Sequence, residues 1–209
     1  MPAWNRTLFL IINAPPHASP LLVHVAWVLA TSPILVAPLL LVILWVRGSR
    51  SRRGGLLATT AAALLAIGIN QILGMIYIEP RPFVIGLGRT LIQHAPDNSF
   101  PSDHATLVWT LMAGLIATGA APGWGIAMGI YGLGVAWARI FLGVHFPLDM
   151  LGSAGVSVAG WGLAVLAMRW PVPWLLPAAE AIYERSIVLL RLPPSLVPRA
   201  ATAPVPENR

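Results

Sequence analysis

Long stretches without a charged side chain dominate this sequence and limit what it can fold into. Only 10% of the residues are charged, and the mean hydropathy is +0.76. A soluble domain has about 25% charged residues, so this chain cannot cover a globule with charge. Charge-free stretches are long enough to cross a bilayer as helices. They run over 21–46, 55–78, 105–138 and 150–168.

The third stretch contains a turn signal, Gly119-Ala120-Ala121-Pro122-Gly123, and we expect it to form two spans. The fold class predicted is therefore an all-α, polytopic membrane helix bundle with five spans. Residues 8–12 are too short an apolar stretch for a signal peptide, and residues 4–12 are expected to form an interfacial helix. Residues 174–192 are expected to form an amphipathic interfacial helix. One membrane-embedded domain would thus cover 1–192, followed by a proline-rich, disordered tail over 193–209.

Composition excludes several kinds of chemistry. The chain has no cysteine, which rules out disulfides, thiolate metal sites and cysteine nucleophiles. All thirteen basic residues are arginine, so neither a Schiff-base lysine nor a lysine phosphate ligand is present. The net charge of +6 does not indicate a nucleic-acid partner, because the arginines are scattered among apolar segments.

Arginine clusters predict the orientation. Four arginines crowd 47–53, and further arginines follow residue 168, among them those at 169, 185, 191 and 199. The positive-inside rule places both groups in the cytoplasm, and with them the C-terminus. The connections over 79–103 and 139–147 then lie outside. For a bacterial protein, the membrane would be the inner one.

The unusual polar residues lie at the predicted helix tips on that outer side, although they are far apart in the sequence. They are Arg81, Ser102, Asp103, His104, Arg139, His145 and Asp149. Arginines on the side that the positive-inside rule disfavours indicate an anionic ligand, and guanidinium groups match phosphate oxygens. Ser102 is expected to cap the helix that follows it, leaving backbone N–H groups to hold an anion.

His145 and Asp149 are four residues apart across a predicted helix start, so the carboxylate can turn back to the imidazole. A carboxylate that accepts the Nδ1–H leaves Nε2 as a nucleophile or base. A purely structural His–Asp pair is the alternative. His104 would supply a titratable proton donor beside the anion site.

Three segments resemble the phosphatase motifs of the type-2 phosphatidic acid phosphatase superfamily: Glu79-Pro80-Arg81-Pro82-Phe83, Pro101-Ser102-Asp103-His104, and Arg139 with His145 and Asp149. Together with 91–95 and 182–184, they resemble the bacterial undecaprenyl-diphosphatases of the bacitracin-resistance type. Two positions depart from the superfamily pattern: Gly74 stands where it has a lysine, and Ala138 precedes Arg139 where it has a serine.

The resemblance implies hydrolysis of a polyprenyl diphosphate lipid, with His145 as nucleophile, Asp149 orienting it, and His104 as acid and then base. Arg81, Arg139 and Ser102 would bind phosphate, while Asp103 and Glu79 would adjust the arginines or discriminate between head groups. No metal or cofactor is expected, since the arginines neutralise the charge.

Other readings remain open at this stage. They are a phosphatidate, phosphatidylglycerophosphate or lipid A phosphatase, a phosphotransferase, and a small transporter. The oligomeric state is not predicted.

Overall fold

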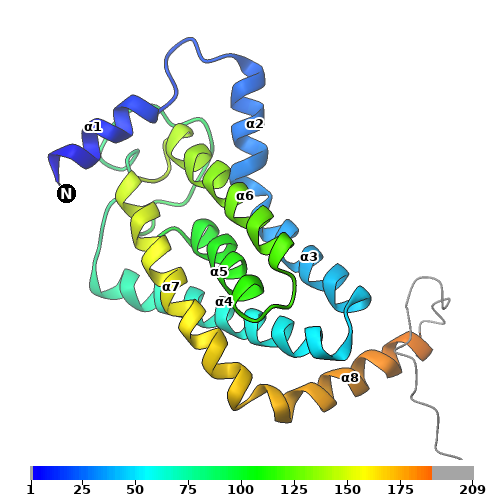
Figure 1. Cartoon of the computed structure of the whole chain (residues 1–209). Helices are drawn as coiled ribbons and strands as arrows, with labels where there is room; N and C mark the ends of the chain where they lie inside the picture. The colour runs from blue at the N-terminus through cyan, green and yellow to red at the C-terminus, as the bar shows by residue number, and fades with distance from the viewer. Residues whose placement is uncertain (1, 190–209) are drawn as a thin grey trace, which may run out of the picture.

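The computed structural model describes residues 2–189 and contains eight helices (Figure 1). Their bounds are α1 Ala3–Ile12, α2 Pro20–Thr31, α3 Pro33–Arg47, α4 Arg50–Ile76, α5 Asp103–Ala117, α6 Pro122–Phe141, α7 Pro147–Arg169 and α8 Val172–Leu189. Within the described residues the only β pairing is an isolated bridge between Pro80 and Asn98. The all-α class is therefore confirmed. The predicted tail over 193–209 and the last residues of the C-terminal helix predicted to end at 192 lie outside the described residues.

Three helices, α4, α6 and α7, are long and apolar enough to cross a membrane. The pair α2 and α3 passes the same test as one span that is bent by 55°. The bend falls at Pro33, one of two prolines in this stretch, because proline cannot donate a backbone hydrogen bond to the preceding turn. The helix α5 has 15 residues, about 22 Å at 1.5 Å per residue, and is short for a bilayer core of about 30 Å. The count of five spans thus stays a prediction.

The short helix α5 occupies the middle of the bundle, in contact with α3, α4, α6 and α7. Glycines allow these close approaches. A Cβ at Gly114 would lie 2.7 Å from the Thr59 side chain, and one at Gly160 would lie 2.8 Å from that of Thr110. Small residues at helix contacts are typical of membrane bundles, where dispersion contacts rather than the hydrophobic effect hold the helices together.

The alternating chain direction brings four helix tips to one end of the bundle. The helices α4 and α6 end there, α5 and α7 begin there, and the loops 77–102 and 142–146 connect them (Figure 1). This arrangement matches the prediction that the polar helix tips share one side of the membrane.

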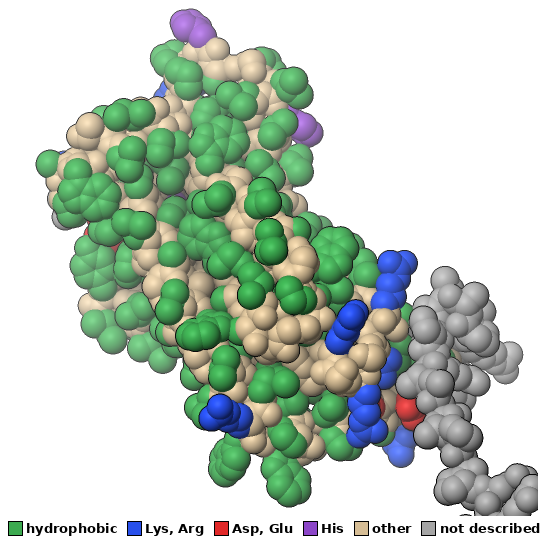
Figure 2. All heavy atoms as spheres, in the orientation of Figure 1, with side chains coloured by type: hydrophobic (Ala, Val, Ile, Leu, Met, Phe, Trp, Pro, Cys, Tyr) green, Lys and Arg blue, Asp and Glu red, His purple; other side chains and the backbone are tan. Residues whose placement is uncertain are grey.

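The surface separates apolar and basic regions. Hydrophobic side chains cover much of the face seen in Figure 2, and the arginines gather toward the end where α3 ends and α8 lies. An apolar surface this extensive marks a molecule that faces lipid. The basic end is opposite to the end that carries the polar helix tips.

Candidate active site

A cavity of about 380 Å³ opens among the polar helix tips. Its lining comes from the end of α4, the loop 77–102, the start of α5, the end of α6 and the α6–α7 loop. Three imidazoles and two guanidinium groups line it: those of His94, His104, His145, Arg81 and Arg139. The structure therefore brings together the two histidines and the two arginines that the sequence motifs predicted, and it adds a third histidine.

The end of α6 places His145 beside the cavity. Gly143 has a φ of +83°, and its N–H donates to Ile140 O while the N–H of Val144 donates to Arg139 O. These two bonds form a Schellman motif, for which a glycine is the favoured residue because it adopts positive φ without strain. The turn folds the chain back over the helix end, which brings His145 next to Arg139 of the preceding turn.

The start of α7 then places Asp149 against His145. Asp149 Oδ2 accepts a hydrogen bond from the Phe146 N–H at 2.8 Å, an N-terminal capping interaction, and lies 3.1 Å from His145 Nδ1. Both His145 and Asp149 are 1% exposed. The predicted contact between these two side chains is present. Because the carboxylate accepts at Nδ1, the imidazole carries its proton there and Nε2 keeps a lone pair.

Two guanidinium groups face that lone pair. Arg81 NH1 lies 3.1 Å from His145 Nε2, and Arg139 NH2 lies 3.2 Å from it. A guanidinium donates and cannot accept, which supports the same tautomer. His145 Nε2 thus lies between two guanidinium groups at the cavity wall.

Each arginine is held in place by further contacts. Arg81 donates through Nε to Asp97 at 2.7 Å and through NH1 to Val144 O at 2.9 Å. Arg139 donates through NH1 to Ala30 O at 3.1 Å, and its NH2 lies 3.1 Å from His94 Nε2. Such contacts fix the planes of both guanidinium groups before any ligand arrives.

Burial and charge lower the basicity of the two loop histidines. Burial is the largest cause for His145, followed by the positive charges of Arg139 and Arg81, and together they hold its pKa well below the usual 6.5. Burial is also the main reason why the pKa of His94 is lowered. His145 is therefore neutral at pH 7 and keeps its lone pair.

Ser102 corrects one prediction. It precedes α5 at the N-cap position, but its side chain makes no capping hydrogen bond, and it does not line the cavity. The residue is fully buried against α7, where its N–H donates to Ser153 Oγ at 3.0 Å and its carbonyl accepts from the same hydroxyl. The Ser102 hydroxyl itself is buried and has no hydrogen-bond partner among the described residues, so the predicted cap is absent and a role in phosphate binding stays a prediction.

Glu79 and Asp103 do not form an ion pair with an arginine within the described residues. Their expected roles, adjusting the arginines or discriminating between head groups, stay predictions. Glu79 is buried outside the cavity lining and accepts a hydrogen bond of 2.5 Å from the Tyr77 hydroxyl. Asp103 lines the cavity and accepts from Asn70 Nδ2 at 2.8 Å and Gln71 Nε2 at 3.1 Å. The carboxylate that pairs with Arg81 is Asp97 instead.

Ser99 makes a buried contact with Asp149 that the sequence did not predict. Its hydroxyl donates to Asp149 Oδ2 at 2.5 Å and lies 3.4 Å from His145 Nδ1. Nothing in the spacing between Ser99 and Asp149 indicates this contact, since 50 residues separate them. The contacts of Asp97 with Arg81 and of His94 with Arg139 were also not predicted. The sequence gives only a weak indication of them, because both residues lie in the outer loop, shortly before the segment that contains Ser102.

Residues that could hold a metal ion were also considered. Across residues 2–189 no group of three or more histidine and acidic side chains has an arrangement suited to a metal ion. The cavity is lined by two carboxylates, those of Asp97 and Asp103, as well as by the two guanidinium groups. The guanidinium groups of Arg81 and Arg139 suit the oxygens of an anion such as phosphate.

Comparison with known proteins agrees with this geometry. Residues 55–174 match the PAP2 superfamily. BcrC of Bacillus subtilis, named an undecaprenyl-diphosphatase, is 32% identical over 74% of this chain and 79% of its own length. YbjG of Escherichia coli K12, to which that activity is provisionally assigned, is 34% identical over 75% of this chain and 78% of its own length.

A solved structure shares the fold as well. The crystal structure of Aquifex aeolicus LpxE superposes with a TM-score of 0.61 at 25% identity, covering 80% of this chain and 96% of that one. The helical bundle, the cavity with its two guanidinium groups and the family match together define a membrane-embedded lipid phosphatase. The chain belongs to the PAP2 superfamily.

Proposed function

We propose that this protein hydrolyses undecaprenyl diphosphate to undecaprenyl phosphate and inorganic phosphate through a phosphohistidine at His145. One observation carries the proposal: His145 Nε2 faces the cavity between two guanidinium groups, while Nδ1 is held by Asp149. This is the arrangement of an oriented nucleophile beside a site for charged oxygens.

The reaction takes two steps. The lone pair of His145 Nε2 attacks the terminal phosphorus, and the bond from that phosphorus to the bridging oxygen breaks, so that the electron pair leaves with the lipid monophosphate. Asp149 stabilises the imidazolium that forms. Water then attacks the phosphorus, the phosphorus–nitrogen bond breaks, and the neutral imidazole is restored.

His104 lies in the first turn of α5 and lines the cavity, where it is suited to transfer protons. In the first step it protonates the leaving oxygen, and in the second it takes a proton from water. Arg81 and Arg139 bind the equatorial oxygens, where charge concentrates in phosphoryl transfer. Two fixed guanidinium groups supply this charge, so the mechanism requires no metal ion.

A lipid diphosphate fits the surroundings of the cavity. Met75 lines it and is 79% exposed. Exposed apolar side chains continue along the end of α4 at Ile72 and Ile76, and just beyond it at Ile78. A head group in the cavity therefore leaves the prenyl chain against an apolar surface that faces lipid. The names of the relatives BcrC and YbjG support the choice of substrate.

The orientation is part of the same proposal. Exposed arginines gather at the end of the bundle opposite the cavity, and the positive-inside rule assigns that end to the cytoplasm. The cavity then opens outside the inner membrane of a bacterium, and the C-terminus is cytoplasmic. Recycling of the lipid carrier for cell-wall synthesis would follow from hydrolysis on that side.

A direct comparison of substrates tests the proposal. Purified protein in detergent with EDTA receives undecaprenyl diphosphate, phosphatidate or phosphatidylglycerophosphate, and phosphate release is followed for each. We expect the diphosphate to be the preferred substrate and the chelator to have no effect. Preference for a monoester would replace the substrate assignment with one of the related lipid phosphatases, and loss of activity in EDTA would contradict the metal-free mechanism.

A further inference from the structure

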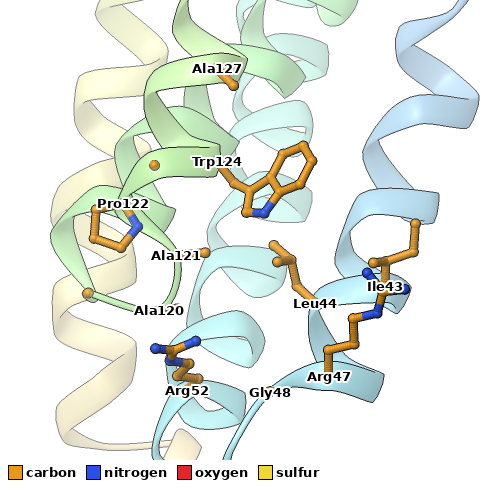
Figure 3. A pocket seen from close by; sticks show the side chains of 12 residues that line it. Ile43, Leu44, Arg47, Gly48, Arg52, Ala120, Ala121, Pro122, Trp124 and Ala127 are labelled. Atoms are coloured by element: carbon orange, nitrogen blue, oxygen red, sulfur yellow. The ribbon is translucent and has the colours of Figure 1, made fainter. Parts of the chain in front are cut away.

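A second pocket, of about 580 Å³, lies at the opposite end of the bundle from the cavity. It is formed where α3 ends and α4 begins, and where the turn from α5 leads into α6 (Figure 3). We call it the basic groove; its lining includes Ile43, Leu44, Arg47, Arg52 and Trp124. The groove shares no lining residue with the cavity that contains His145.

No side chain among the described residues balances the charge of the groove. Arg47 and Arg52 are exposed, and neither forms a side-chain hydrogen bond or an ion pair with the part of the chain that the structure describes. The neighbouring Arg50 and Arg53 differ, because they face Glu180 at 3.3 Å and 3.7 Å. The nearby carboxylate is thus taken by the other two arginines.

The remaining wall of the groove is apolar. Figure 3 shows the Trp124 indole and the Leu44 side chain between the arginines and the body of the bundle. Trp124 is 51% exposed, and the exposed side chains of Leu39, Ile43 and Ile126 extend the apolar surface along α3 and α6. A ligand that fits must therefore carry negative charge at one end and hydrocarbon at the other.

We propose that the basic groove binds an anionic phospholipid, whose phosphate lies between Arg47 and Arg52 and whose acyl chains lie along Trp124 and Ile43. The groove has the charge and the apolar walls of the basic pockets at cytoplasmic helix ends that bind anionic head groups. Tryptophan also favours the level of the membrane interface, where its ring meets both head groups and chains. This site does not depend on the activity proposed for the cavity.

Fluorescence quenching tests the proposal without any substrate of the enzyme. The protein is placed in nanodiscs of phosphatidylcholine that contain a small fraction of phosphatidylglycerol with brominated chains, which quench tryptophan on contact. The signal of Trp124 is the difference between the wild-type protein and Trp124→Phe. We expect brominated phosphatidylglycerol to quench this signal at much lower mole fractions than brominated phosphatidylcholine does.

Charge variants supply the decisive comparison. Arg47→Gln with Arg52→Gln should raise the mole fraction for half-quenching by about 25-fold, since each arginine near an anionic surface contributes about fivefold in affinity. The control, Arg169→Gln with Arg185→Gln, removes the same charge from exposed positions outside the groove and should change it little. Thermal denaturation of both variants shows whether they fold.

Three results would overturn the site. Equal quenching by both brominated lipids would mean that the groove contacts bulk lipid only. Equal effects of the two double variants would mean that net charge, and not the groove, attracts the lipid. Absence of Trp124 quenching by either lipid would mean that something other than lipid covers it. Inorganic phosphate separates a lipid site from a site for free phosphate. Quenching by brominated phosphatidylglycerol should persist in millimolar phosphate if the groove binds the lipid, and its loss would show a site for free phosphate instead.

Discussion

The hydroxyl of Ser99 offers a sharp test of how the nucleophile is positioned. In Ser99→Ala the side-chain donor to Asp149 is removed, while the bonds from Phe146 N–H and His145 Nδ1 remain. Ser99 does not line the cavity, so its removal leaves the phosphate contacts unchanged. The expected effect is a lower kcat at an unchanged KM.

The size of the effect follows from the contacts of Asp149. A hydrogen bond to a charged group contributes about 1.5–3 kcal/mol. Two of the three donors to Oδ2 persist and limit the movement of the carboxylate, so we expect the lower end of this range, about 1.5 kcal/mol or slightly more than tenfold in kcat. Asp149→Asn should cost far more, about 10⁴-fold, because an amide can hold the imidazole in the wrong tautomer.

Ser157→Ala is the matched control. Its hydroxyl is also buried and donates to Ser153 O at 2.7 Å, but Ser157 lies about two helical turns beyond Asp149 on α7 and does not contact it. Steady-state phosphate release should show unchanged kcat in this variant, and thermal denaturation should show losses of stability for both serines. Equal losses of kcat in the two serine variants, or a fully active Asp149→Asn, would refute the positioning role of Asp149.

Three further predictions concern the arginines and the protonation of His145. Arg139→Lys should lower kcat/KM at least about 100-fold, because one ammonium group cannot replace a guanidinium group that reaches Ala30 O, His94 and His145 together. A near-normal kcat/KM would contradict this. Asp97→Asn should raise KM only about two- to fivefold, because the Asp97 side chain is 61% exposed and exposed ion pairs are weak; loss of more than about 100-fold would give Asp97 a direct role. In a pH profile, kcat/KM should not fall as the pH drops to 6.5, because a lowered pKa keeps His145 unprotonated there, and an acid limb centred above 6.5 would show the opposite shift.

The positions of the polar helix tips and the contact between His145 and Asp149 could be predicted from the sequence. Charge-free stretches and turn signals located the helices, and the spacing of His145 and Asp149 is short enough for a helix start to determine their contact. Alternation of helix direction was enough to bring Arg81, His104 and Arg139 to the same end.

Partners across the long loop could not be predicted in the same way. The path of residues 77–102 decides that Asp97, and not Glu79 or Asp103, meets Arg81, and that Ser99 reaches Asp149. These contacts depend on tertiary packing, which no periodic pattern encodes. Ser102 shows the same limit, because a capping residue by sequence became a buried contact of α7.

A covalent intermediate on His145 is the most direct test of the central claim. The protein is mixed with diphosphate lipid that carries ³²P at the terminal phosphate, and the reaction is quenched in alkali within a single turnover. The mechanism predicts label on the protein that is stable in alkali and lost in acid, as expected of a phosphorus–nitrogen bond, located at His145 and absent in His145→Asn. Turnover without labelled protein, or label that persists in His145→Asn, would contradict it.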